Sequence, residues 1–221
     1  MMKTIFKNRV EAGERLAREL DSYFRYPNTI VLALPRGGVP IAYAIATYLE
    51  LPLDICLVRK IGVPEHQELA MGAIAFGGIL ITNEDIIQEF EISAVVFNQI
   101  VAQETEELAR RNYRYRSSRL PRQVTNQTII LVDDGVATGA TLKAAIALLS
   151  TQHPAAIIVA IPVAPPMISL EYLPRVKEII CLHQPQCLGS ISLWYDDFFQ
   201  TTDKEVCQLL EAAEYRYYSR Q

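Results

Sequence analysis

The stretch Thr128–Thr141, T-I-I-L-V-D-D-G-V-A-T-G-A-T, decides the fold of this chain. It opens with the apolar run Ile129–Val132, which has no polar alternation and is typical of a strand buried on both faces of a parallel sheet. Asp133 and Asp134 follow where that strand ends. A short loop with two glycines comes next, and an alanine- and leucine-rich helix begins at Ala140. The sequence therefore predicts a strand–loop–helix unit of a parallel α/β sheet.

The predicted loop has the components of an anion site. In an open α/β sheet, ligands bind beyond the carboxyl ends of the strands. The loop offers backbone N–H groups, the hydroxyls of Thr138 and Thr141 and a helix N-terminus, which together suit a phosphate. Asp133 and Asp134 would repel a phosphate, so they indicate a ligand that also has hydroxyl groups, or a Mg²⁺ ion. A sugar phosphate meets both conditions. The simpler alternative, a strand–turn–helix with a capping Asp, does not require two adjacent carboxylates.

The run V-D-D-G-V-A-T-G-A-T resembles the phosphoribosyl pyrophosphate (PRPP) signature of the type I phosphoribosyltransferases. The hydrophobic run, the acid pair, the glycine, Thr-Gly and the last threonine all have the family's spacing. The resemblance implies that the acid pair holds the ribose hydroxyls and that the loop holds the 5′-phosphate. The residues concerned are Asp133, Asp134, Gly135, Val136, Ala137, Thr138, Gly139, Ala140 and Thr141.

Length and composition set bounds on the other possibilities. The 221 residues predict a single domain, and half of them are hydrophobic, which is enough for a sizeable core. The net charge of −4 gives no sign of the basic face that general nucleic-acid binding requires. The four cysteines include no C-x-x-C pair, which argues against a zinc site or a disulfide framework and favours a reduced cytoplasm. No signal peptide or membrane-spanning run is visible.

A second strand–loop–helix unit lies upstream, with a strand at Thr29–Leu34, the loop P-R-G-G and a helix at Val39–Glu50. It predicts a second anion site at the same edge of the sheet, although a tight turn that needs glycine is the simpler alternative. Within the resemblance, L-P-R-G-G-V-P is similar to the loop that contacts the pyrophosphate of PRPP, which often carries a strained or cis peptide. That assigns pyrophosphate binding to Arg36, Gly37 and Gly38.

A third strand is predicted at Leu53–Val58, and Arg59 and Lys60 follow it. Two cations at the carboxyl end of a strand, near two phosphate loops, suggest a clamp on a leaving pyrophosphate, and the resemblance agrees. Two solvated charges are the alternative. Arg59 and Lys60 are therefore catalytic candidates together with the acid pair.

The irregular segment Ile61–Thr82 reads as a lid beside this site. A β-hairpin that turns at Gly77 and Gly78 is predicted within it. In the resemblance this segment is the flexible hood loop that closes over PRPP and excludes water from an oxocarbenium-like state. Hypoxanthine-using relatives carry a carboxylate where this chain has Ala137. The lid's Glu65, His66 and Glu68 are then the candidates for acid–base help.

The remaining elements complete an alternating pattern of strands and helices. A long helix at Ser93–Arg116, capped by Ser93, leads into the basic–aromatic run R-R-N-Y-R-Y-R-S-S-R. That run suggests nucleic acid, a subunit contact or, most simply, cations that complement the helix dipole. The other predicted helices are Asn8–Phe24, with Asn8 as N-cap, and a last helix capped by Asp203 that runs to about Tyr215. Strands at Ala155–Pro162 and Glu178–Leu182 and a helical turn at Ile168–Leu173 are also predicted.

Trp194 and Tyr195 are candidates for stacking on a base, with core packing as an equal alternative. The neighbouring run D-F-F-Q-T-T-D-K-E-V resembles a group of bacterial predicted phosphoribosyltransferases without a settled substrate. The expected fold is α/β, a doubly wound and mainly parallel sheet with a core at about 29–162, a lid at about 61–82 and a C-terminal hood and helix at about 183–217.

The resemblance implies a Mg²⁺-dependent transferase of nucleotide metabolism. It would take PRPP and a small-molecule acceptor, release pyrophosphate and act as a cytoplasmic homodimer without membrane contact. The acceptor base is not indicated by the sequence. A PRPP-sensing regulator of the same fold is the main alternative, although no helix-turn-helix segment is visible. An RNA-binding protein that uses the Arg/Tyr-rich run is the weaker one.

Overall fold

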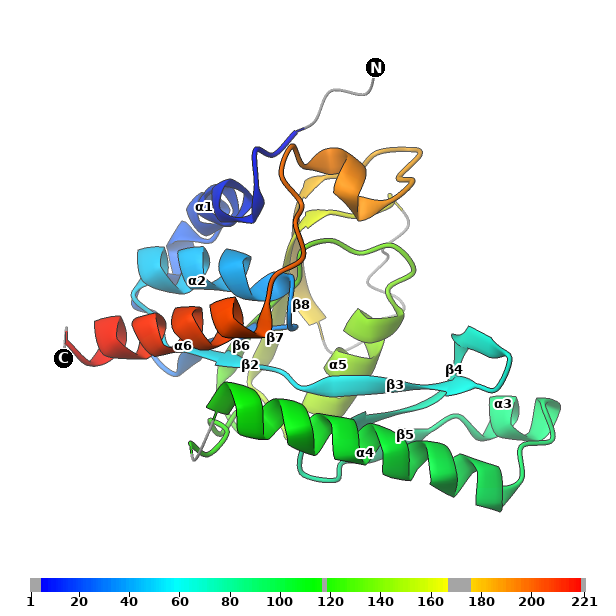
Figure 1. The fold of residues 1–221 in the computed structure, drawn as a ribbon. Coiled ribbons are helices and arrows are strands. Elements are labelled where there is room, and N and C mark those ends of the chain that lie inside the picture. The colour runs from blue at the N-terminus through cyan, green and yellow to red at the C-terminus, as the bar shows by residue number, and fades with distance from the viewer. Residues whose placement is uncertain (1–4, 117–118, 167–175, 220–221) are drawn as a thin grey trace.

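A computed structural model describes residues 5–116, 119–166 and 176–219 of the chain (Figure 1). Its central sheet has five parallel strands in the order β2-β1-β6-β7-β8. The predicted doubly wound α/β fold is confirmed. The strands are β1 (Thr29–Ala33), β2 (Leu53–Ile55), β6 (Thr128–Val132), β7 (Ala156–Val163) and β8 (Val176–His183).

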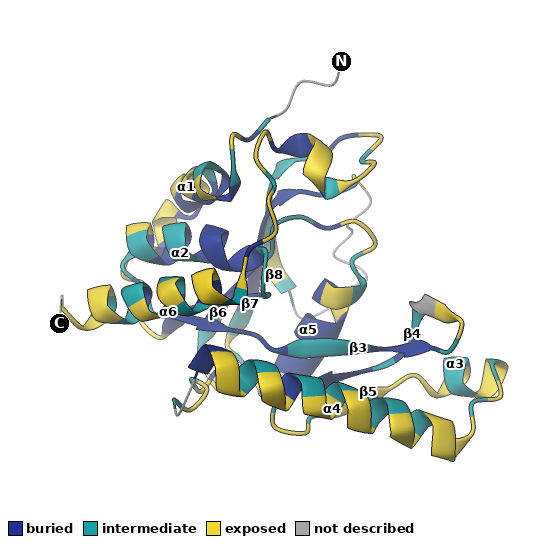
Figure 2. Cartoon of the chain, in the orientation of Figure 1, coloured by how far each residue is buried: buried dark blue, intermediate teal, exposed yellow. Residues whose placement is uncertain are grey.

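Helices cover both faces of this sheet, which is why its central strands read as unbroken apolar runs. Alternate residues of β1 and β6 point to opposite faces: Val31 and Ile130 pack toward α1, α2 and α6, whereas Ile30 and Ile129 pack toward α5. Strands β1 and β6 are buried along nearly their whole length (Figure 2). The helices are α1 (Arg9–Glu19), α2 (Gly38–Leu49), α5 (Ala140–Ser150) and α6 (Asp203–Tyr218).

A second sheet, antiparallel, lies where the sequence predicts a flexible lid. Its strands are β3 (Val58–Val63), β4 (His66–Ala75) and β5 (Leu80–Thr82), in that order. The hairpin predicted at Gly77 and Gly78 is confirmed, because β4 and β5 pair across that turn and both glycines have positive φ. We call these strands, with α3 (Glu84–Glu89) and α4 (Ala94–Arg116), the hood; from here on the name refers to these elements and not to the C-terminal segment at about 183–217.

The predicted strand Leu53–Val58 is wrong in its extent. The core strand β2 ends at Ile55, and the chain passes through Cys56 and Leu57 into β3 of the other sheet. Arg59 and Lys60 therefore lie inside a hood strand rather than at the end of a core strand. The stretch Ile55–Val58 is continuously apolar, so hydropathy alone does not show where the chain changes sheets.

The helix caps follow the sequence with one correction. The side chains of Asn8 and Ser93 accept hydrogen bonds from the N–H groups of Glu11 (3.0 Å) and Val96 (3.3 Å), as predicted. Helix α6 is capped by Thr202 instead of the predicted Asp203, because the Thr202 hydroxyl accepts the Glu205 N–H at 3.1 Å.

As the first helical residue, Asp203 has a carboxylate that is free to bond to other elements. The first helix is also shorter than predicted and ends at Glu19, before the 3₁₀ turn η1 (Asp21–Tyr23). The predicted turn Ile168–Leu173 lies outside the described residues. Among the described helices, none is long and apolar enough to span a membrane.

Candidate functional site

The two predicted anion loops meet at one edge of the central sheet. They follow β1 and β6, which are neighbours in the sheet and run parallel. The loop after β1 continues this contact, because the Leu34 N–H donates to the Val132 carbonyl at 2.8 Å. A Cβ at Gly38 would lie 2.7 Å from that same carbonyl oxygen, so only glycine fits there. The Pro35–Arg36 peptide is cis, as the resemblance leads us to expect.

The acid pair lies between these loops. The Asp134 carboxylate packs against the loop after β1 so closely that a Cβ at Gly37 would be 1.9 Å from Asp134 Oδ2. Asp133 Oδ1 accepts the Asp134 N–H at 2.9 Å. Burial, together with the neighbouring Asp134 charge, raises the pKa of Asp133 well above its ordinary value. Both members of the pair are thus partly buried.

Arg9 of α1 is part of this site, although its sequence context does not indicate a site residue. Its Nε and Nη2 both donate to Asp134 Oδ2, at 3.0 and 2.7 Å. Its Nη1 donates to the Phe199 carbonyl at 2.7 Å, and the guanidinium lies 3.8 Å from the centre of the Phe198 ring. Arg9 is only 9% exposed. An arginine in an amphipathic helix normally predicts a solvated face, so no signal in the sequence marked it.

The loop after β6 is shaped to leave backbone N–H groups open. The Val136 N–H donates to the Val163 carbonyl at 2.9 Å, which fixes the middle of the loop. Among the residues described, the N–H groups of Ala137, Thr138 and Gly139 have no hydrogen-bond acceptor, and the first two residues are exposed. Gly139, with φ 76°, leads directly into α5. Open N–H groups at a helix N-terminus are what an anion binds.

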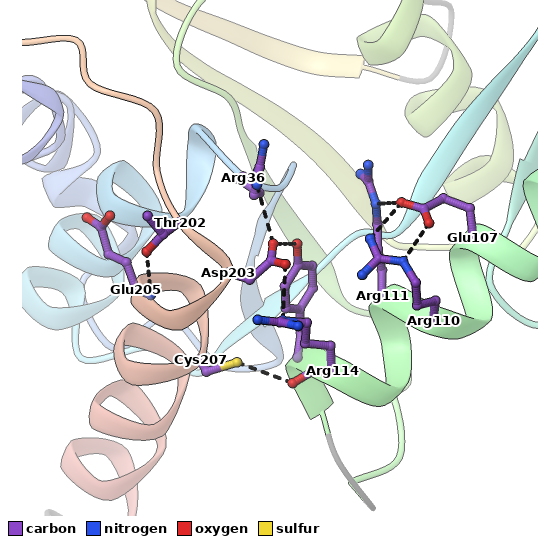
Figure 3. A network of polar contacts seen from close by, with 10 residues as sticks. Arg36, Glu107, Arg110, Arg111, Arg114, Thr202, Asp203, Glu205 and Cys207 are labelled. Atoms are coloured by element: carbon purple, nitrogen blue, oxygen red, sulfur yellow. Dashed lines mark hydrogen bonds and ion pairs between the residues drawn. The ribbon is translucent and has the colours of Figure 1, made fainter.

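The three cationic side chains that the sequence assigns to pyrophosphate binding, those of Arg36, Arg59 and Lys60, extend in different directions. Arg36 extends from the loop after β1 toward α6, where its Nη1 lies 3.5 Å from Asp203 Oδ1 (Figure 3). Arg59 forms an ion pair with Glu104 of α4. Lys60 is the next residue of β3 and therefore lies on the opposite face of that strand, the face that packs toward α5.

Asp203 joins the first residues of α6 to α4 (Figure 3). It accepts the Tyr115 hydroxyl at 2.7 Å and pairs with Arg114 Nε at 3.0 Å, in addition to Arg36. Burial and the hydrogen bond to the Asp203 carboxylate raise the pKa of Tyr115 to about 12 from an ordinary value of 10.0. The network links the loop after β1 to the hood.

Because Tyr115 titrates later in the folded state, its contribution to stability should be complete below pH ~10 and should fade as the pH rises toward ~12. We expect Tyr115→Phe to lower the free energy of unfolding by about 1–2 kcal/mol near neutral pH. The difference between wild type and variant should shrink above pH ~10, since phenylalanine does not titrate. Urea unfolding at several pH values measures it. A difference independent of pH up to ~12 would contradict the assignment.

The arginines of the Arg/Tyr-rich run pair with carboxylates of the same chain. Each of its five arginines forms an ion pair with a carboxylate among the described residues. Arg116 is the buried one, 5% exposed, and bonds to Asp54 of β2. The others are Arg110 and Arg111 with Glu107, Arg114 with Asp203, and Arg119 with Glu214. These contacts give the run a structural role between α4, β2 and α6.

Trp194 and Tyr195 are 6% and 4% exposed, so their rings present little surface to a ligand. The Trp194 indole donates to the Leu188 carbonyl at 2.9 Å, and the Tyr195 hydroxyl donates to the Asp134 carbonyl at 2.7 Å. Tyr195 thus holds the backbone of the acid pair at Asp134. Phe199, whose backbone carbonyl bonds to Arg9, has an exposed ring, at 86%.

Comparison with known proteins agrees with this architecture. Residues 2–183 match the family of the phosphoribosyl transferase domain. A Mycobacterium tuberculosis protein provisionally named a phosphoribosyl transferase, known from strains H37Rv and CDC 1551, is 36% identical over 209 residues. The match includes 95% of this chain and 47% of that protein, so the chain spans about half the length of these relatives.

Among solved structures, TT1426 from Thermus thermophilus superposes with a TM-score of 0.82 at 35% identity, over 94% of this chain and 98% of that one. The matched region of the family contains both loops, the acid pair and the hood. The chain therefore belongs to the phosphoribosyl transferase domain family.

Proposed function

We propose that this protein is a Mg²⁺-dependent phosphoribosyltransferase. It binds PRPP across the two loops, joins ribose 5-phosphate to a nitrogen nucleophile and releases pyrophosphate. One observation carries the proposal: two anion loops meet at one edge of the sheet, with the acid pair enclosed between them and Asp134 packed against Gly37. A ligand with a diol between two phosphate groups matches that order of groups.

The proposed roles follow the geometry. The acid pair, Asp133 and Asp134, faces the ribose, and the loop Gly135–Thr141 holds the 5′-phosphate through the open N–H groups of Ala137, Thr138 and Gly139. Gly37 and Gly38 let the backbone approach the pyrophosphate closely. Neutralising the leaving pyrophosphate as the C1–O bond breaks is the main electrostatic task, and it falls to the cations around that loop.

Those cations are Arg36, Lys60 and Arg59. In the free protein, Arg36 and Arg59 are held by the carboxylates of Asp203 and Glu104. We therefore expect PRPP to compete with these carboxylates for the two guanidinium groups.

The donor set of the site fits Mg²⁺ that arrives with its substrate. Adjacent carboxylates are oxygen donors of the kind that Mg²⁺ prefers, but Asp134 is already neutralised by Arg9. Mg²⁺ bound mainly through PRPP, with most of its waters retained, is consistent with that set. When bound, Mg²⁺ adds positive charge beside the leaving pyrophosphate. The expected homodimer stays a prediction from the family resemblance, and the cytoplasmic location stays a prediction from the cysteine pattern.

Phe199 is the residue that we propose for contact with the acceptor base. Its backbone carbonyl is bonded to Arg9, which also bonds Asp134, and its ring is exposed to solvent. Because that ring buries little surface when the chain folds, Phe199→Ala should leave the free energy of unfolding within about 0.5 kcal/mol of wild type.

The same variant should reduce, by about tenfold, the affinity advantage of a nucleoside 5′-monophosphate over ribose 5-phosphate, since the ring no longer stacks on the base. Calorimetric titration of both ligands measures this ratio. Tyr215→Ala, which removes another exposed ring, is the matched control and should leave it unchanged. An unchanged ratio in Phe199→Ala would remove Phe199 from the site.

Titration of PRPP into the protein, with Mg²⁺ and then with EDTA, tests the proposed function. Mg²⁺-dependent binding with a Kd of roughly micromolar size supports the PRPP site. A panel of bases is then screened for pyrophosphate release. Binding without release by any base would favour the PRPP-sensing alternative, and a folded protein that does not bind PRPP would reject the proposal.

A further inference from the structure

We propose that Arg9 is a positioning residue of this site, and that the two members of the acid pair have different roles. Arg9 neutralises Asp134 and fixes its carboxylate against Gly37, so that Asp133 alone presents an unneutralised carboxylate to the ligand. This inference rests on the proposed function, because it assigns the contacts through which PRPP is held.

The first argument is the geometry of the pair. Arg9 reaches Asp134 with two nitrogens, at 3.0 and 2.7 Å, and their side chains are 10% and 19% exposed. A charge-assisted contact of this kind is strong when it is shielded from water. Among the described residues, Asp133 forms no ion pair, so the two carboxylates are not equivalent.

The second argument is where the Asp134 carboxylate lies. It touches Gly37 of the loop to which the proposed function assigns the pyrophosphate. PRPP brings several negative charges to that place, and like charges at short range repel strongly in a partly buried site. The Arg9 guanidinium neutralises Asp134 and so removes this repulsion. It also keeps the carboxylate in position to hold the two loops together.

The third argument is that the same guanidinium holds the segment 196–202, which we call the strap and which joins η3 (Ile191–Trp194) to α6. Nη1 donates to the Phe199 carbonyl, and Phe198 stacks on the guanidinium. Arg9 therefore connects α1, the acid pair and the strap at one point, and its removal would loosen all three contacts together.

The test compares wild type, Arg9→Gln, Asp134→Asn and the double variant by calorimetric titration with inorganic pyrophosphate and with PRPP, both with Mg²⁺. Arg9→Gln exposes the ligand to an unneutralised Asp134 and should weaken both affinities about tenfold or more. Adding Asp134→Asn should restore the pyrophosphate affinity to within about threefold of wild type, because the repelling charge is gone. Because the second substitution also removes a partly buried unpaired carboxylate, urea unfolding of all four proteins is measured alongside, and an affinity change without a matching stability change identifies the repulsion.

Arg9→Lys keeps the charge but loses the planar fork and the stacking on Phe198, so it should recover only part of the affinity that Arg9→Gln loses. Arg15→Gln, on the same helix but paired with Glu11, is the matched control and should change nothing. If Arg9→Gln fails to fold, the double variant and Arg9→Lys decide the question, since both avoid an unpaired buried carboxylate. A folded Arg9→Gln with wild-type affinities, or a double variant as weak as Arg9→Gln, would overturn the inference. Wild type that does not bind PRPP would instead reject the proposed function, and this inference would fall with it.

Discussion

Replacing both members of the acid pair, in the Asp133→Asn/Asp134→Asn variant, is expected to abolish PRPP turnover while the fold stays intact. Hydrogen bonds from ribose hydroxyls to charged carboxylates contribute about 1.5–3 kcal/mol each, so losing them should lower turnover by at least about a hundredfold. Removing the Asp133 charge should favour the folded state, because burial raises the pKa of that carboxyl, and this offsets part of the stability lost with the Arg9–Asp134 ion pair. The amide that replaces the Asp134 carboxylate can still accept the Arg9 hydrogen bond through its oxygen.

Pyrophosphate release measures turnover, and urea unfolding measures stability. The Glu84→Gln/Asp85→Asn variant is the matched control, since it removes two adjacent negative charges at the start of α3, away from the loops. It should retain wild-type activity. Full activity in the acid-pair variant would contradict the assignment of the site, whereas loss of the folded state would make Asp133→Asn alone the deciding variant.

The parts of the site that the sequence predicts correctly are those whose signal is local. The run Ile129–Val132 is apolar without alternation because both of its faces are covered, and this requirement is visible in four consecutive residues. Gly37 and Gly38 are likewise marked by their own type, since a side chain at either position would collide with the loop or strand beside it. The fold class follows from repeating such units along the chain.

What the sequence does not predict depends on pairing between distant residues. Arg9 and Asp134 are 125 positions apart, and an arginine on a helix has the same local pattern whether it faces water or a carboxylate. The change of sheet after Ile55 is hidden for a related reason, because hydropathy reports burial and not which sheet a strand joins. Burial of Trp194 and Tyr195 depends in the same way on what packs over them.

The largest stability effect is expected at Arg116, the last residue of α4. Its guanidinium bonds to Asp54 Oδ1 at 3.0 Å, to the Ile55 carbonyl at 2.6 Å and to Asn112 Oδ1 at 2.8 Å. Arg116→Met leaves Asp54 as an unpaired carboxylate in a buried position, which should cost about 3–5 kcal/mol of the free energy of unfolding. Urea unfolding measures the loss.

The same contact explains how the hood is anchored to the core. Asp54 belongs to the edge strand β2, so its ion pair joins the hood helix α4 directly to the central sheet. If Arg116→Met is destabilising because it leaves the Asp54 carboxylate buried without a countercharge, the double variant Asp54→Leu/Arg116→Met should recover most of the lost free energy of unfolding. The exposed Arg110, which pairs with Glu107 on the surface, is the matched control, and Arg110→Met should cost less than about 1 kcal/mol. A double variant as unstable as Arg116→Met would show instead that the guanidinium's bonds to Ile55 and Asn112 dominate, because those bonds are lost in both variants.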